Sequence, residues 1–227
     1  RMIIEVLLQG SIKGVGKLHK TAIFPCGIFQ CMKGVNREEG DPNYDLFQLA
    51  LRSTAQRLYP NYANVDWSVN AGYDKNDPRT YVSTMGCRTY NGFDINGLGY
   101  LKDGRGNIAP VTIIMPTLAM EANKNISKFL ELLDLKITEA KDMLIERYNW
   151  ICSQNPASAQ FMYENGLMAG YDGKTIESAM KHGTLVIGQL GLAETLQILI
   201  GKDHTTPEGM ALAKTIESLF NKRCKEF

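Results

Sequence analysis

Hydrophobic residues recur at helical spacing in two stretches of the chain. After Asn125, apolar side chains return every three or four residues as far as about Cys152, which predicts one long helix capped by Asn125 or Ser127. The apolar positions of this helix are Phe129, Leu132, Leu133, Ile137, Ala140, Leu144 and Tyr148. A second stretch opens at Asp41-Pro42 and predicts a packing helix of roughly 15 residues.

Three runs of apolar, β-forming residues predict buried strands. They cover residues 22–32, 111–115 and 184–189, and a shorter candidate covers 65–69. Pro25 and Gly27 favour a sheet edge or a bulge in the first run. Because a strand at 111–115 is followed by a long helix, the pattern indicates an α/β fold.

Shorter elements fill the rest of the chain. Residues 1–9 form a short apolar segment, and residues 10–20 read as a flexible glycine- and lysine-rich loop that does not match the P-loop spacing. Residues 153–182 predict short helices around a glycine-rich loop, and further helices are expected from 191–194 and from about 207. No repeat or linker divides the chain, so we expect one domain or part of one.

Composition excludes several classes of protein. The 227 residues carry a formal net charge of +1, which argues against nucleic-acid binding. No signal peptide pattern is present and no apolar run approaches the ~20 residues that cross a membrane, so we expect a soluble, cytoplasmic protein. The five cysteines are irregularly spaced and fit neither a disulfide framework nor a zinc site; they are Cys26, Cys31, Cys87, Cys152 and Cys224.

Common catalytic and metal-binding patterns are missing. His19, His182 and His204 have no ligand-spaced partners, so no metal site is expected. Glu194 falls in the first turn of a predicted helix, where a carboxylate favours the helix dipole, and we assign it a capping role. No GxSxG nucleophile elbow occurs.

One cysteine lies in a loop suited to chemistry. Residues 84–89 read TMGCRT, so Cys87 is flanked by a glycine and a cation between polar clusters. On spacing alone, a lone cysteine is more often a small buried hydrophobe, and a methionine such as Met85 is more often core filler.

Several motifs in sequence order favour a functional role for Cys87 over the packing role. TMGCRT is followed by GRGN at 104–107 and by a strand that ends in MPTLA at 115–119. Two further stretches match the same pattern. One covers residues 24–36, from Phe-Pro to KGVN, and the other covers residues 183–194, from Gly-Thr to GQLGLAE. In this order the motifs resemble the central catalytic barrel of the anaerobic (class III, glycyl-radical) ribonucleotide reductases, and the resemblance covers most of the chain.

The resemblance implies a ten-stranded α/β barrel with a cysteine-bearing finger loop at its centre. Residues 1–227 would supply a partial catalytic barrel domain with about half of those strands. No segment resembles the family's ATP cone, its zinc module or its RVxGY-like glycyl-radical segment. We therefore expect these residues alone to be inactive.

The resemblance also assigns residues to roles. It gives the thiyl radical to Cys87 and hydrogen bonding to substrate hydroxyls or formate to Asn107. Met85 would line the same pocket, and Arg88 and Arg105 are interpreted as structural. Cys26 and Cys31 are poor candidates for the reducing partner cysteine, which the family places much farther upstream.

Cofactors and partners follow from the family alone. No cofactor is expected in this chain, whereas the parent protein would have a glycyl radical, a structural zinc and ATP or dNTP effectors. Its substrate would be a ribonucleoside triphosphate, its activator a radical-SAM enzyme with an iron-sulfur cluster, and its assembly a homodimer. The alternative is a non-catalytic α/β fragment or split subunit that binds nucleotide or a partner chain, favoured if apolar side chains enclose Cys87.

Overall fold

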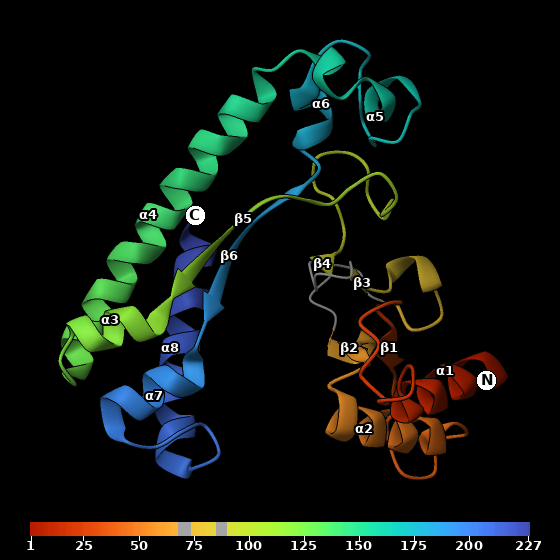
Figure 1. The fold of residues 1–227 in the computed structure, drawn as a ribbon. Helices are drawn as coiled ribbons and strands as arrows, with labels where there is room; N and C mark the ends of the chain where they lie inside the picture. Colours follow the sequence, from red (N-terminus) through yellow and green to blue (C-terminus); the bar gives the residue numbers. More distant parts are fainter. Residues whose placement is uncertain (68–73, 85–89) are drawn as a thin grey trace. The chain divides into compact units, whose positions relative to one another are not determined.

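The computed structural model describes residues 1–67, 74–84 and 90–227. The chain divides into two compact units, which we call unit 1 (Arg1–Gly106) and unit 2 (Asn107–Phe227). Among the described residues, three separate two-stranded sheets occur. Helices and strands alternate in both units, which confirms the predicted α/β class (Figure 1).

Unit 1 is built on two helices and a parallel strand pair. Helix α1 (Met2–Lys13) packs on α2 (Tyr44–Arg57), and β1 (Ile28–Cys31) pairs with β2 (Asn61–Asn64). The buried side chains shared by these elements are Leu8, Phe29, Cys31, Leu46 and Ala50. Aromatic rings add to this core, because Phe29 contacts both Phe47 and Tyr62.

The remaining elements of unit 1 are short. Two single 3₁₀ turns, η1 (Val65–Trp67) and η2 (Pro78–Thr80), precede β3 (Ser83–Thr84) and β4 (Tyr90–Asn91), which pair antiparallel. The carboxylate of Asp77 caps η2 by accepting a hydrogen bond from the backbone N–H of Arg79 at 3.0 Å.

Three predictions for unit 1 were wrong in their boundaries. The expected loop at 10–20 begins as helix, since α1 continues to Lys13. The expected strand at 22–32 shrinks to β1, because Pro25 offers no N–H to a ladder and Gly27 weakens strand structure. The strand expected from 65 lies earlier, at β2, and residues 65–67 form η1 instead.

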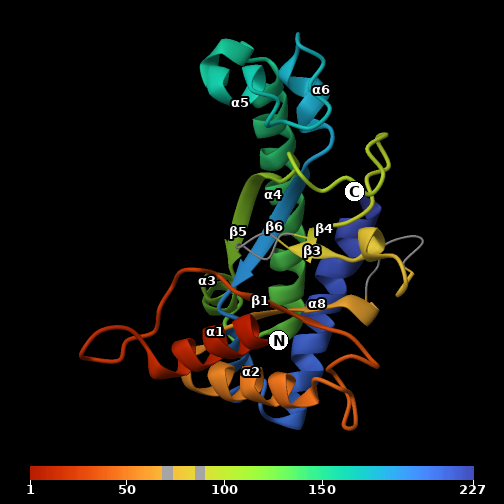
Figure 2. The same cartoon turned by 90° about the vertical axis from the view of Figure 1, so that its right-hand side faces the viewer.

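Unit 2 contains a parallel strand pair covered by helices. Strand β5 (Asn107–Ile114) pairs with β6 (Thr184–Leu190). The long helix α4 (Ile126–Cys152) runs alongside both strands (Figures 1 and 2). The main core joins this sheet to α3 (Met115–Glu121), α4, α7 (Leu192–Ile200) and α8 (Pro207–Glu226).

The helices of unit 2 follow the sequence pattern closely. In α4 the buried positions are Phe129, Leu133, Ile137, Ala140 and Leu144, as the helical spacing predicts. The amide oxygen of Asn125 accepts from the N–H of Lys128 at 3.0 Å, which confirms it as the cap. At α8, the hydroxyl of Thr206 accepts from the N–H of Gly209 at 3.1 Å.

Residues 153–182 form a smaller cluster beside the end of α4. A 3₁₀ helix η3 (Pro156–Ala159), α5 (Gln160–Glu164) and α6 (Ile176–Met180) surround buried Tyr163, Ile176, Ala179 and Met180. This arrangement confirms the predicted short helices around a glycine-rich loop.

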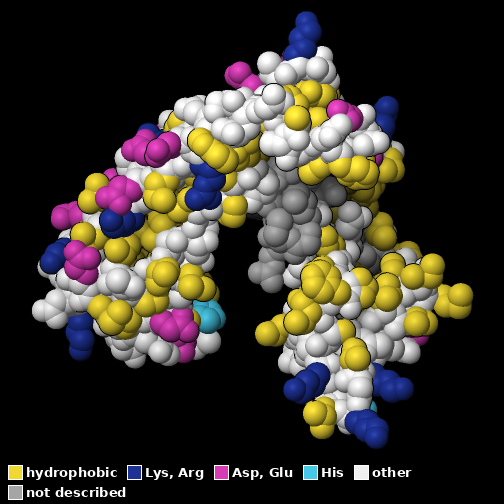
Figure 3. Space-filling model, turned by 45° about the horizontal axis from the view of Figure 1, so that its top comes forward, with side chains coloured by type: hydrophobic (Ala, Val, Ile, Leu, Met, Phe, Trp, Pro, Cys, Tyr) yellow, Lys and Arg dark blue, Asp and Glu magenta, His cyan; other side chains and the backbone are white. Residues whose placement is uncertain are grey.

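The described helices include none that is both long and apolar enough to traverse a lipid bilayer. Unit 1 nevertheless exposes apolar side chains, which Figure 3 shows gathered on its surface. Those of α1 are Met2, Ile3, Ile4, Val6 and Leu7.

Candidate functional site

Asn107, the predicted substrate-binding residue, is the first residue of β5. Its partner in the parallel ladder is Thr184, the first residue of β6. The ladder is irregular immediately afterwards. The next pair is Ala109 with Leu185, so β5 has one extra residue between the two pairs. A bulge of this kind redirects side chains at the end of a strand.

The side-chain oxygen of Asn107 is buried and accepts no hydrogen bond. The hydroxyl oxygen of its neighbour Thr184 is likewise buried and unpaired. Since buried polar atoms are nearly always hydrogen-bonded, two orphaned oxygens on facing residues require an explanation. An asparagine amide can donate two hydrogen bonds and also accept. The start of β5 thus retains unused hydrogen-bonding capacity.

Met85 and Cys87 lie outside the residues that the structure describes. The residues on either side of this segment are paired, with Thr84 opposite Tyr90 and Ser83 opposite Asn91. Because Asn107 belongs to unit 2, the structure does not test whether it meets Cys87. Their joint role in a site therefore stays a prediction.

Two basic side chains form hydrogen bonds to backbone carbonyl oxygens around the loop that precedes Asn107. Nη1 of Arg105 donates to the carbonyl oxygens of Gly92 and Leu101, each at 2.8 Å. Nζ of Lys102 donates to the carbonyl oxygen of Arg79 at 2.6 Å, and burial lowers the pKa of this lysine. These contacts support the structural interpretation of Arg105, whereas Arg88 lies outside the described residues.

The histidines do not form a metal site in the described chain. No group of three or more histidine, cysteine, aspartate or glutamate side chains able to hold a metal ion occurs among the residues described. His182 is buried, while His19 lies exposed with Nδ1 at 2.9 Å from the carbonyl oxygen of Lys13. Glu194 falls in the first turn of α7, where its charge favours the helix dipole as predicted. The N-cap of α7 is Gly191, and no side-chain hydrogen bond from the described residues caps this helix, so the support from Glu194 is electrostatic only.

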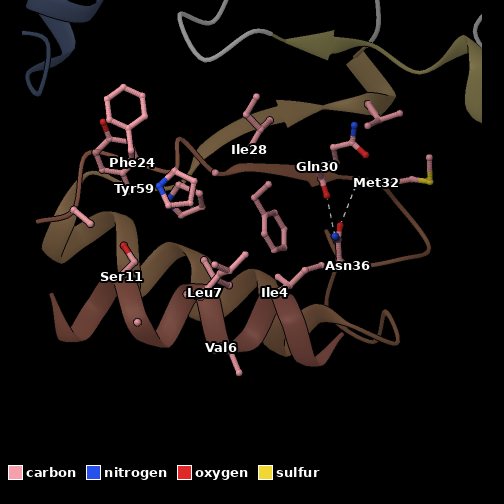
Figure 4. Close-up of a pocket in the computed structure, with 18 of the residues that line it drawn as sticks. Ile4, Val6, Leu7, Ser11, Phe24, Ile28, Gln30, Met32, Asn36 and Tyr59 are labelled. Carbon is pink, nitrogen blue, oxygen red and sulfur yellow. Dashed lines mark hydrogen bonds between the residues drawn. The ribbon is translucent and has the colours of Figure 1, made fainter. Parts of the chain in front are cut away.

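A large apolar cavity that the sequence did not reveal lies in unit 1. It measures about 780 Å³ and is bounded mainly by α1, β1 and the segment before β1. Figure 4 shows Phe24 and Tyr59 toward one end and Gln30, Met32 and Asn36 toward the other. Asn36 is held in place by bonds to the carbonyl oxygen of Gln30 at 2.9 Å and the N–H of Met32 at 3.0 Å.

The lining of this cavity has little capacity for catalysis. Among the described residues that line it there is no carboxylate, cation, histidine or cysteine, and its polar side chains are Ser11, Gln30, Asn36, Tyr59 and Tyr81. Such a lining can bind apolar groups but supplies no general acid, base or nucleophile near neutral pH. The sequence signal was the apolar run at residues 2–8, whose helical form was not predicted.

A family model described as anaerobic ribonucleoside-triphosphate reductase matches residues 1–227. The chain belongs to this family. This membership confirms the resemblance drawn from the ordered motifs around Cys87 and Asn107.

Curated relatives of the anaerobic reductase family are similar along most of the chain. The anaerobic ribonucleoside-triphosphate reductase of Escherichia coli (strain K12) is 32% identical over 224 residues, covering 95% of this chain and 30% of the relative. The one from Haemophilus influenzae is 33% identical over 209 residues, covering 90% and 28% respectively. The chain therefore spans less than a third of the length of these reductases.

A solved reductase supports the fold. The crystal structure of the anaerobic ribonucleotide reductase from Thermotoga maritima with citrate in the active site aligns with a TM-score of 0.55 at 17% identity. The alignment covers 90% of this chain and 33% of that structure. At this identity the likeness concerns the fold alone.

Proposed function

We propose that this chain is part of the catalytic core of an anaerobic ribonucleoside-triphosphate reductase. The whole enzyme would convert ribonucleoside triphosphates to deoxyribonucleotides by thiyl-radical chemistry. The observation that carries the proposal is the match of the family model to residues 1–227. The order of the TMGCRT and GRGN motifs within this match agrees with it.

The proposed setting is one partial domain, residues 1–227, of a ten-stranded α/β barrel with a central finger loop. Parallel sheets are normally covered on both faces. The β5–β6 pair has helices against Val111, Ile113 and Ile187, yet Ile114 and Leu190 remain more than half exposed. Further strands and the finger loop of a complete barrel would cover these side chains.

Cys87 would carry the radical step. Its thiyl sulfur takes a hydrogen atom from C3′ of the ribose, so that an S–H bond forms as the C–H bond breaks and the unpaired electron passes to the sugar. The 2′ hydroxyl can then leave as water after protonation. The reductant, formate or a thioredoxin-type thiol, supplies two electrons, and Cys87 returns a hydrogen atom to C3′.

Asn107 and Met85 would position the substrate. The amide of Asn107 can donate to a ribose hydroxyl or to formate, and its unpaired, buried oxygen supports a role beyond packing. Met85 would line the same pocket as a flexible apolar contact.

The other components belong to the whole enzyme. A glycyl radical on another segment would supply the oxidising equivalent for Cys87. The structural zinc would belong to the zinc module of the parent, which the family resemblance places outside the motifs found here. ATP or dNTP effectors, a radical-SAM activating enzyme with an iron-sulfur cluster, a homodimeric assembly and a cytoplasmic location complete the proposal.

The test is replacement of the sulfur in the full-length protein. Cys87→Ser should abolish deoxyribonucleotide formation after anaerobic activation, because an O–H bond is too strong for the same exchange. Cys224→Ser, an equal change at an exposed position of α8, should retain turnover. Circular dichroism and nucleotide binding would show that both variants are folded.

Two results would contradict the proposal. If the activated wild-type protein forms no deoxyribonucleotide, the proposed reductase function is wrong. If Cys87→Ser turns over as wild type does, Cys87 does not carry the radical. This result would favour the alternative of a non-catalytic nucleotide- or partner-binding module.

A further inference from the structure

Thr184 and Asn107 present matching, unused hydrogen-bonding groups. They face each other as the first pair of the β5–β6 ladder. Both side-chain oxygens are buried, and neither has a partner. A polar atom that is buried without a partner is unfavourable, so both residues would gain from a hydrogen bond that satisfies these oxygens.

The chemistry of the pair is complementary. The amide oxygen of Asn107 can only accept a hydrogen bond, whereas the hydroxyl of Thr184 can donate one. Neighbouring strands lie roughly 4.8 Å apart, which brings facing side chains within reach of each other. A threonine hydroxyl moves between staggered positions by rotation about a single bond, so a change of rotamer can redirect this donor.

We propose that Thr184 is a positioning residue for Asn107. Its hydroxyl donates to Oδ1 of Asn107 when substrate is bound, which fixes the plane of the amide and directs the Nδ2 donors toward the substrate. Thr184 acts through Asn107 and does not itself contact the reacting atoms. The inference rests on the proposed function, because it takes Asn107 as the residue that binds substrate.

The test compares three variants of the full-length protein in binding CTP without radical activation. Thr184→Val keeps the branched shape but removes the donor, and should weaken CTP binding about fivefold, as expected for one neutral hydrogen bond. Thr184→Ser retains the hydroxyl and should bind within about twofold of wild type. Thr112→Val, the same change at an exposed position of β5, should also bind as wild type does.

A double-mutant cycle separates positioning from a merely structural effect. In an Asn107→Ala background, Thr184→Val should cause no further loss, since the amide through which Thr184 acts is gone. An equal fivefold loss in that background would overturn the inference, as would wild-type affinity in Thr184→Val. Turnover of the activated wild type tests the proposed function separately. The role of Thr184 and the reductase function can therefore be contradicted independently of each other.

Discussion

The guanidinium of Arg57 donates two hydrogen bonds to the carbonyl oxygen of Ile12, from Nε at 3.0 Å and from Nη2 at 2.8 Å. Ile12 lies in the last turn of α1, where carbonyl groups lack partners within the helix. A cation from the last turn of α2 therefore caps α1, and the contact also favours the α1 dipole. This contact fixes one end of the helix that borders the unit 1 cavity.

Loss of this cap should loosen α1. We expect Arg57→Ala to lower the free energy of opening of α1 by about 1.5 kcal/mol, the contribution of a hydrogen bond to a charged donor. Hydrogen exchange of peptides from residues 2–13 in the full-length protein would measure it. Arg52→Ala, at an exposed position of the same helix, serves as the control. Equal exchange in both variants would contradict the capping role.

Gly170 should not tolerate a side chain. Its φ of +76° is strained for other residues, and a Cβ built there would collide with Nε2 and Cδ2 of the buried His182. Gly173 has a similar φ of +80° but open space around it. Gly173→Ala should therefore cost about 1 kcal/mol from φ alone, and Gly170→Ala about 3 kcal/mol once the clash is added.

Chemical denaturation of the two variants, with hydrogen exchange of residues 160–182 as the local readout, would test this difference. If both alanine variants lower the free energy of unfolding equally, the predicted clash between a side chain at residue 170 and His182 does not contribute.

The carboxylate of Asp172 should titrate far below the usual range. It accepts hydrogen bonds from the backbone N–H groups of Thr175 and Lys174, both at 2.8 Å, and these bonds lower its pKa from 3.8 to about 2. The stabilisation is therefore complete above pH 3.8 and is lost as the pH falls through about 2. Carbon-detected NMR titration of the side-chain carboxyl would measure the midpoint, and a value near 3.8 would contradict the bonding.

The sequence predicted the elements whose apolar pattern is long, and missed those that depend on distant partners. Helix α4 repeats its apolar face over many turns, so its bounds and its Asn125 cap were predictable. Helix α1 was not, because residues 2–8 are apolar at every position except Glu5 and their period is therefore ambiguous.

The same distinction applies to the candidate site. Asn107 was found from a local motif, whereas Thr184 comes beside it only through pairing of strands far apart in sequence. Cys87 and Met85 were assigned by the same local motifs, and the described residues leave those assignments as predictions.

Two cysteines of unit 1, Cys26 and Cys31, should differ in their reactivity toward an alkylating reagent. Cys31 is only 5% exposed, within the core formed by α1, α2 and β1, and burial raises the pKa of its thiol. Cys26 is half-buried, and its thiol donates to the carbonyl oxygen of Ile23 at 3.4 Å. Thiolate is the reactive form in alkylation and disulfide exchange, so Cys31 is doubly protected.

In folded protein at pH 8, iodoacetamide should therefore modify Cys31 at least about tenfold more slowly than Cys26. Peptide mass spectrometry of timed samples would give both rates, and the denatured protein, in which the two rates should converge, is the control. A slow Cys31 agrees with our interpretation that it is not the reducing partner of Cys87. Rapid modification of Cys31 in the folded state would contradict its burial and would reopen that assignment.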